Sequence, residues 1–340
     1  MTKENTTFII AELSANHNGS LQTALDSVKA AKEIGVDAIK IQTYTADTLT
    51  IDCEKDDFII KGETLWDGKK LYHLYKEAYT PWEWQKQIFE YANSLGLVCF
   101  SSPFDKSSID FLEGIGNPIY KIASFEIQDI PLIRYAASKG KPMIISTGIA
   151  ELADIELAVK TCREVGNNDI TLLKCTSAYP APIKEANLIM MKEFESRFKV
   201  KVGLSDHTLG TTLPIAAVAM GAQVIEKHFI LDKNIGGPDA AFSLDKKDFS
   251  QMVKAVRDVE KAIGKVDYTL TDKQITNKRF GRSLYVVEDV KAGELFTEKN
   301  IRSIRPGFGM HPKYLEDVLG EKACCDIEKG TALSDRHLGK

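Results

Sequence analysis

Short apolar runs alternate with amphipathic helical segments over roughly 260 residues, and this alternation restricts the fold more than any other feature. Each run is short, rich in Ile, Val and Leu, and bounded by glycine or polar residues, as buried strands are. Strands are expected at 7–13, 37–44, 96–104, 117–126, 141–148, 169–180, 200–204 and 222–226. Helical patterns lie at 21–34, 81–95, 105–114, 129–139, 150–166, 184–196, between the last two strands, and at 245–263.

Eight strand–helix units predict an α/β fold, a (β/α)₈ TIM barrel. A doubly wound open sheet is the alternative, but no glycine-rich dinucleotide fingerprint follows the first strand. We therefore expect a barrel domain over residues 1–265. A linker with threonine punctuation follows at 266–277, and short β runs split by Asp, Gly and Lys turns predict a small β-rich domain over 278–340. Such an appendage is often a structural cap or dimerisation module, and its R-P-G-F-G loop offers one candidate functional residue, Arg305.

Composition excludes several functions. The chain has 340 residues with a net charge of −4, which gives no electrostatic reason to expect nucleic acid or an anionic membrane as partner. An anionic substrate would need local lysines. The N-terminus has no signal-peptide layout, and no apolar run is long enough to cross a bilayer. The six cysteines show no disulfide-framework or zinc-motif spacing, so reduced thiols and a cytoplasmic location are expected.

Polar side chains gather where the predicted strands end. In a barrel these ends surround the active site, so a carboxylate such as Glu12 near the end of an apolar run needs a partner there. Lys40 and Gln42 share one face of their strand, which favours an inward lysine over an outer one. The strand-end residues are Glu12, Lys40, Gln42, Ser102, Lys121, Ser124, Glu126, Ser146, Ser177, Tyr179, His207 and His228.

These residue types suit an anionic substrate and acid–base chemistry. Two lysines with several hydroxyls suit a phosphate and a carboxylate. Two carboxylates suit general acid–base work, and two neutral imidazoles at successive strand ends suit a divalent metal that polarises a carbonyl. A lone histidine is more often a satisfied polar residue than a ligand, so the metal hypothesis depends on His207 and His228 being adjacent.

A long excursion at 47–80 interrupts the alternation, and long loops after barrel strands are usually functional. All three tryptophans of the chain, Trp66, Trp82 and Trp84, lie in it or just after it. Their rings would either stack on a sugar or anchor the loop to the barrel, and anchoring is the commoner use.

Taken together, these residues resemble the sialic acid synthase family, phosphoenolpyruvate-condensing enzymes that make nonulosonic acids. The resemblance covers nearly the whole chain, as a synthase barrel followed by an antifreeze-like (SAF) domain. The motifs stand in the family's order. They are E-L-S-A-N-H-N-G-S, K-I-Q-T, Y-K-I-A-S-F-E, I-I-S-T-G, C-T-S-A-Y-P, G-L-S-D-H-T, E-K-H-F, G-P-D and R-P-G.

The resemblance implies a role for each matching position. His207 and His228 would bind manganese or magnesium, while Glu12, Glu126 and Lys121 would be catalytic. Arg305 would reach into the partner subunit's barrel, which implies a domain-swapped homodimer. Lys40, Ser102, Lys121, Ser124, Ser146 and Ser177 would surround phosphoenolpyruvate, and Gln42, Tyr179, Asp239 and Arg305 would place the sugar.

Within the family, the aromatic stretch around Trp66 resembles the pseudaminic acid synthases. The implied reaction joins phosphoenolpyruvate, water and 2,4-diacetamido-2,4,6-trideoxy-L-altrose, and it releases phosphate by C–O cleavage. The product would decorate bacterial surface glycans or flagella. Ser177 stands where N-acetylneuraminate-making members generally have Asn, which favours a different sugar. The alternatives are an N-acetylneuraminate or legionaminate synthase, a metal-dependent aldolase or hydrolase, and a sugar-binding or ice-binding protein.

Overall fold

Eight parallel strands close into a barrel in the structure, a computed structural model that describes residues 6–62 and 65–339. Each strand pairs with its sequence neighbours, and β8 pairs with β1. Closure confirms the predicted TIM barrel and excludes an open sheet. The strands are β1 (Phe8–Glu12), β2 (Ala38–Thr43), β3 (Val98–Pro103), β4 (Tyr120–Ile122), β5 (Met143–Ser146), β6 (Ile170–Cys175), β7 (Lys201–Asp206) and β8 (Val224–His228).

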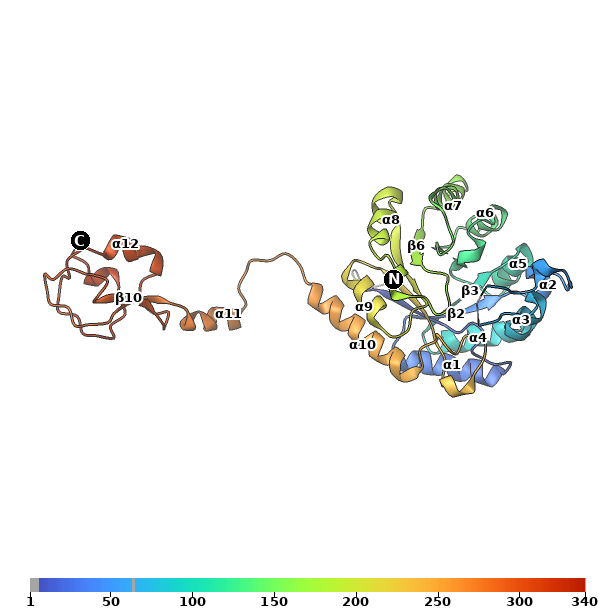
Figure 1. Cartoon of the computed structure of the whole chain (residues 1–340), viewed down its shortest axis with the longest axis horizontal. Coiled ribbons are helices and arrows are strands. Elements are labelled where there is room, and N and C mark those ends of the chain that lie inside the picture. Colours follow the sequence, from blue (N-terminus) through green and yellow to red (C-terminus); the bar gives the residue numbers. More distant parts are fainter. Residues whose placement is uncertain (1–5, 63–64, 340) are drawn as a thin grey trace. The chain divides into compact units, whose positions relative to one another are not determined.

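Helices surround the strands of this first compact unit, which extends to Gly264 (Figure 1). Local sequence sets their ends: the Ser20 side chain accepts the Thr23 N–H at the start of α1, and Gly35 ends it at φ 86°. The barrel helices are α1 (Leu21–Ile34), α4 (Trp82–Ser94), α5 (Lys106–Gly114), α6 (Ile130–Ala137), α7 (Leu152–Glu164), α8 (Met190–Phe198), α9 (Thr212–Ala219) and α10 (Lys246–Ile263). Two short helices, α2 (Ala46–Leu49) and α3 (Leu71–Ala78), lie in the excursion after β2.

Several strand ends differ from the sequence prediction. The strand expected at 117–126 ends at Ile122, and Ser124–Glu126 form a 3₁₀ turn instead. β6 ends at Cys175, which leaves Ser177 and Tyr179 in the following loop. The last two strands run two residues further than predicted, to Asp206 and His228. Strand ends depend on hydrogen bonds to neighbouring strands, which a single segment's pattern does not contain.

Inward-facing side chains form two levels in the barrel interior. One level is apolar, and the level nearer the carboxyl ends of the strands is polar. Side chains two residues apart on a strand point to the same face, so each inward apolar residue is followed by an inward polar one. Ile10 precedes Glu12 in this way, and Val224 precedes Glu226. The apolar level contains Ile10, Ala38, Phe100, Ile144, Leu173 and Val224. A larger core between strands and helices holds the barrel in shape, so the polar level sits on a rigid base.

The second compact unit begins at Lys265. Its strands β9 (Ser283–Val286) and β10 (Ile301–Ile304) pair antiparallel, and Leu284, Val286, Phe296 and Ile301 belong to its own core. Its helices are α11 (Asp272–Asn277), which lies in the segment predicted to be a linker, and α12 (Leu315–Val318). The 3₁₀ helices of the chain are η1 (Asp56–Phe58), η2 (Ser124–Glu126), η3 (Ile183–Glu185), η4 (Lys233–Ile235), η5 (Lys278–Phe280), η6 (Pro312–Tyr314) and η7 (Asp335–His337).

None of the helices in the described part of the chain has the length and apolar character needed to cross a membrane. The N-terminal segment 1–5, where no leader pattern was expected, and Thr64 in the aromatic stretch lie outside the described residues.

Candidate active site

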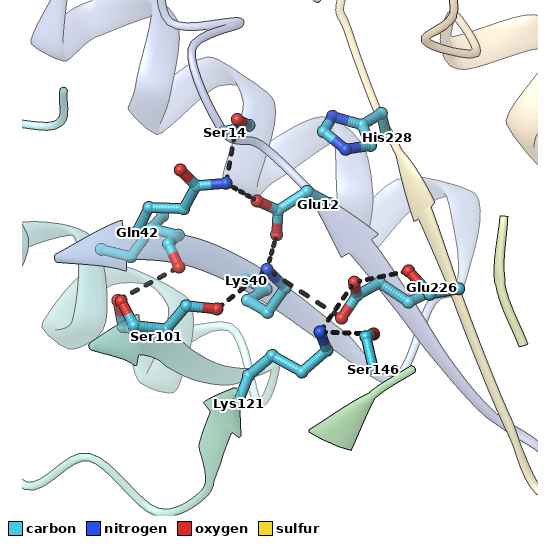
Figure 2. A network of polar contacts seen from close by, with 12 residues as sticks. Glu12, Ser14, Lys40, Gln42, Ser101, Lys121, Ser146, Glu226 and His228 are labelled. Carbon is cyan, nitrogen blue, oxygen red and sulfur yellow. Dashed lines mark hydrogen bonds and ion pairs between the residues drawn. The ribbon is translucent and has the colours of Figure 1, made fainter. Parts of the chain in front are cut away.

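Two buried lysines and two buried glutamates form the centre of the polar level (Figure 2). Lys40 Nζ lies 2.6 Å from Glu12 Oε2 and 3.9 Å from Glu226 Oε2, while Lys121 Nζ lies 3.6 Å from Glu226 Oε1. Strand register produces this cluster, because Glu12 pairs with Lys40 of β2 on one side and with His228 of β8 on the other. Lys40 therefore points into the barrel, as its shared face with Gln42 predicts.

The charges of this cluster depend on one another. Burial acts to lower the pKa of Lys40, but the carboxylates of Glu12 and Glu226 outweigh it and raise that pKa. Burial acts to raise the pKa of Glu226, whereas Lys121 and Lys40 lower it. The pKa of Lys121 is lowered, mainly by burial. Glu226 is therefore charged and is shared by two ammonium groups, because an uncompensated charge at this depth would be costly.

Hydroxyl groups surround the two lysines. Lys121 Nζ donates to Ser146 Oγ at 2.7 Å, and Lys40 Nζ donates to Ser102 Oγ at 3.3 Å. On the other side, Gln42 Nε2 donates to Glu12 Oε1 at 2.9 Å and to Ser14 Oγ at 3.1 Å. Ammonium and hydroxyl donors converging on one buried space are suited to an anion with several oxygens.

Gly148 brings two further predicted serines to this space. Its N–H donates to Ser124 Oγ at 3.1 Å. A Cβ at Gly148 would lie 2.1 Å from Ser177 Oγ and 2.8 Å from Ser124 Oγ, so both hydroxyls crowd against its backbone. Only glycine allows this approach.

The two histidines predicted to hold a metal are neighbours, with ring centroids 5.4 Å apart. His207 Nδ1 lies 3.1 Å from the Thr176 carbonyl oxygen, which it can contact only as a donor, so the neutral form of the ring has its lone pair on Nε2. His228 Nδ1 is buried and has no hydrogen-bond partner. Burial is the main cause that holds the pKa of His228 well below its usual range, and the nearby ammonium group of Lys40 adds to it. The ring of His228 is therefore neutral, the form that binds metals.

Asp239 completes this side of the site. Its Oδ2 lies 3.6 Å from His228 Nδ1. The same oxygen accepts a hydrogen bond from the Ala15 backbone N–H at 3.5 Å. Among the described residues, however, no group of three or more His, Cys, Asp or Glu side chains is arranged to hold a metal ion. The two imidazoles are therefore the candidate protein ligands, and water or substrate would fill the remaining coordination positions of the metal.

Glu126 lies on η2 beside the lysines. Burial is the main cause that raises its pKa to about 7, against the lowering influence of Lys121. One of its carboxylate oxygens, Oε2, is buried without a hydrogen-bond partner. A carboxyl group that titrates near neutral pH can both donate and accept a proton, which is what a general acid–base catalyst needs.

Aromatic rings line the histidine side. The Tyr179 ring lies 4.5 Å from that of His207, 5.1 Å from that of Phe242 and 5.8 Å from that of Trp66, measured between centroids. Phe242 also packs 4.9 Å from His228. Trp66 of the excursion thus reaches Tyr179.

The other two tryptophans lie on α4 and pack against residues outside the excursion. Trp82 packs on Phe111 at 4.9 Å and donates its indole N–H to the Tyr44 carbonyl oxygen at 3.1 Å. Trp84 packs edge-on against His17.

The predicted residues Glu12, Lys40, Gln42, Ser102, Lys121, Ser124, Glu126, Ser146, Ser177, Tyr179, His207, His228 and Asp239 all belong to the first unit, whereas Arg305 lies in the second, after β10. Sequence reasoning missed Glu226, Gly148, Phe242 and Cys175, whose sulfur lies 3.7 Å from His207 Nδ1. Glu226 carried a usable signal, because it precedes His228 by two residues and so shares its face.

A closed barrel with charged side chains at the carboxyl ends of its strands is the architecture of a TIM-barrel enzyme. Residues 27–268 match the model of the NeuB family, and residues 281–339 match that of the SAF domain. The chain belongs to the NeuB family, in agreement with the resemblance in its motifs. Relatives that are 48–53% identical to it are named as synthases, and it is an enzyme.

Two relatives and one solved structure illustrate this similarity. The chain is 53% identical to the pseudaminic acid synthase of Campylobacter jejuni strain 81-176 over 96% of this chain and 95% of that protein. It is 48% identical to the pseudaminic acid synthase of Helicobacter pylori, covering 96% of each. The crystal structure of N-acetylneuraminic acid synthetase from Leptospira borgpetersenii, in complex with citrate, is 29% identical with a TM-score of 0.71, covering 82% of this chain and 94% of that one.

Proposed function

We propose that this chain is a pseudaminic acid synthase, a transferase that condenses phosphoenolpyruvate with 2,4-diacetamido-2,4,6-trideoxy-L-altrose and water. The observation that carries the proposal is the buried cluster in which Lys40 donates to Ser102 and Lys121 donates to Ser146, in a chain that is similar to pseudaminic acid synthases over both units. The product, pseudaminic acid, would serve bacterial surface glycans such as glycosylated flagellin.

Phosphoenolpyruvate would bind between the lysines. Lys121 with Ser146 and Lys40 with Ser102 offer charge-assisted donors to its phosphate and carboxylate groups. Ser124 and Ser177 supply hydroxyls against Gly148. In a protein of net charge −4, this local positive charge is what attracts and holds a trianionic substrate.

A divalent cation, manganese or magnesium, fits the histidine pair. The unpartnered Nδ1 of His228 and the free Nε2 lone pair of His207 are two imidazole donors within one small space. When bound, the cation would act as a Lewis acid toward the sugar's aldehyde oxygen. Asp239 and Gln42 would orient the sugar beside it.

The carboxylates would handle the protons. C3 of phosphoenolpyruvate attacks the aldehyde carbon and forms the new C–C bond, and the aldehyde oxygen takes up a proton. Water then adds at C2 and loses one proton. The tetrahedral intermediate expels phosphate by breaking the bond between C2 and the phosphate oxygen, while the C2 hydroxyl passes its remaining proton to the phosphate and becomes the ketone oxygen. Glu126, with a pKa raised to about 7, suits these transfers, and Glu12 is the second candidate. Lys40 and Lys121 stabilise the negative charge on the departing phosphate.

The sugar identity is supported by the aromatic rings. A trideoxy, N-acetylated sugar has methyl groups to bury, and Trp66, Tyr179 and Phe242 form an apolar surface beside the histidines. Arg305 would enter the site from the second unit of a partner subunit in a domain-swapped homodimer. The six free cysteines are compatible with a reducing cytoplasm, the compartment that we propose.

The test is phosphate release from phosphoenolpyruvate and manganese with three sugars offered separately: the trideoxy-altrose, its manno isomer and N-acetylmannosamine. Turnover confined to the first sugar is expected. Preference for the manno isomer would favour a legionaminate synthase, and preference for N-acetylmannosamine would favour an N-acetylneuraminate synthase. Phosphate release without any sugar, or no release at all, would contradict the condensation itself and reopen the hydrolase and sugar-binding alternatives.

A further inference from the structure

A fully buried ion pair joins the ends of β7 and β8 directly beside the two histidines. Lys227 Nζ lies 2.5 Å from Asp206 Oδ2, and their side chains are 0% and 1% exposed. Asp206 and Lys227 are register partners, and each immediately precedes a histidine in the chain. Because side chains alternate along a strand, the pair lies on the face opposite to His207 and His228. It fixes the backbone that carries both histidines.

The same two side chains also bond to Thr208, the residue that follows His207. Asp206 Oδ1 accepts the Thr208 N–H at 3.0 Å and its hydroxyl at 2.8 Å, while Lys227 Nζ donates to the Thr208 carbonyl oxygen at 2.7 Å. His207 lies one residue beyond the end of β7 and has left the strand ladder. Bonds from Asp206 and Lys227 to Thr208 therefore hold the chain on both sides of His207 and tie it to β8.

A contribution to folding stability does not by itself explain why this ion pair is buried here. Burying two charges costs several kcal/mol per ion, and apolar residues of similar volume often stabilise a core as well or better. The pair does supply directional bonds: one ammonium and one carboxylate make contacts with each other and with Thr208 that admit a single arrangement. Loss of a group that is hydrogen-bonded to a metal ligand weakens metal binding about 10- to 100-fold, and Asp206 and Lys227 would act on the ligands in a comparable way through the backbone of Thr208.

We propose that Asp206 and Lys227 are positioning residues that set the separation and orientation of the His207 and His228 imidazoles for a divalent cation. The inference rests on the proposed metal site and adds to it a role for two residues outside the site. It predicts that the pair acts as one unit, so that losing either charge disturbs the histidines as much as losing both.

The test measures Mn²⁺ affinity of the full chain without substrate, from the signal of free Mn²⁺ in electron paramagnetic resonance. Asp206→Asn and Lys227→Met are expected to weaken Mn²⁺ binding at least tenfold. The double variant Asp206→Asn/Lys227→Met, which leaves no unpaired buried charge, keeps the test valid if a single variant fails to fold. It is expected to bind Mn²⁺ as weakly as the singles.

Two controls separate positioning from general stability. Asp169→Asn breaks the exposed ion pair with Lys201, whose atoms lie 2.9 Å apart. This pair joins the amino ends of β6 and β7, whereas Asp206 and Lys227 lie at carboxyl ends of strands. Val159→Ala opens a cavity beneath α7, at a residue that is 2% exposed, and is expected to lower the melting temperature without changing β7 or β8. Both controls are expected to keep wild-type Mn²⁺ affinity, whatever their melting temperatures.

The outcomes are distinct. Mn²⁺ affinity within twofold of wild type in the folded double variant would overturn the positioning role. The same would follow if Val159→Ala weakened Mn²⁺ binding as much as the pair variants do, because the effect would then track stability. Failure of the wild type to bind Mn²⁺, or binding undiminished by His207→Ala, would instead overturn the metal assignment on which the inference rests.

Discussion

Glu226 Oε1 lies 3.6 Å from Lys121 Nζ in the polar level of the barrel, and the other oxygen of the same carboxylate lies 3.9 Å from Lys40 Nζ. Glu226 thus occupies the space between the two ammonium groups that an anionic substrate would use. Its negative charge offsets the repulsion between the two ammonium groups when no substrate is bound. The same charge repels the negative charge of a substrate.

Replacing Glu226 by Gln is therefore expected to separate binding from turnover. Without the carboxylate, inorganic phosphate should bind roughly tenfold more tightly, because a repulsive charge near the anion is gone. Turnover should fall at least about 100-fold, because the charge balance of the centre is lost. Calorimetric phosphate titration and a phosphate-release assay measure the two effects. Glu156→Gln, on the exposed surface of α7, is the control, and weaker phosphate binding by Glu226→Gln would contradict this account.

Gly148→Ala is expected to damage phosphoenolpyruvate binding specifically. The new Cβ would lie 2.1 Å from Ser177 Oγ and 2.8 Å from Ser124 Oγ, so both hydroxyls must move. Overpacking of this kind costs about 1–3 kcal/mol, and we expect the KM for phosphoenolpyruvate to rise about tenfold or more. Gly114→Ala is the matched control, since a Cβ there meets nothing within 4 Å. Equal KM values for the two variants would show that the serines do not contact this substrate.

Glu126 should make stability depend on pH. Its pKa is about 7 in the folded chain, against an ordinary value of 4.5 for a glutamate side chain. Between these two values the folded state holds a proton that the unfolded state has released. Stability therefore falls as pH rises through this window, by about 3 kcal/mol for this group. Urea unfolding at pH 5 and pH 8 should show a smaller loss in Glu126→Gln than in wild type, and identical losses would place the pKa of Glu126 near its ordinary value.

The proposed domain-swapped homodimer, in which Arg305 would complete a partner's site, can be tested by mixing inactive chains. Arg305→Ala and His207→Ala homodimers should each have little activity. If Arg305 completes the neighbouring barrel, a mixed dimer has one barrel with both changes and one with neither, so co-refolded chains regain activity. Arg302→Ala, on β10 of the same unit, is the control and should stay active alone. Absence of recovery in verified mixed dimers would place Arg305 at its own subunit's barrel or outside the site.

Local pattern was sufficient for the barrel and for much of its polar level. Each strand's apolar run and each helix's amphipathic period are properties of consecutive residues, so the eight units and the inward face of Lys40 were predictable. The strand-end position of Glu12 also indicated a partner, and Lys40 is that partner.

Tertiary structure alone decided the contacts across strands. The predicted strand ended at Glu226, and only pairing with β1 and β7 shows that β8 continues to His228 with Glu226 facing the lysines. Ser177 against Gly148, Trp66 against Tyr179, and Asp206 against Lys227 join residues far apart in sequence. Sequence determines which residues a strand presents to the barrel interior, because alternation is local. The barrel's closure and register determine which of them meet, because those depend on every strand at once.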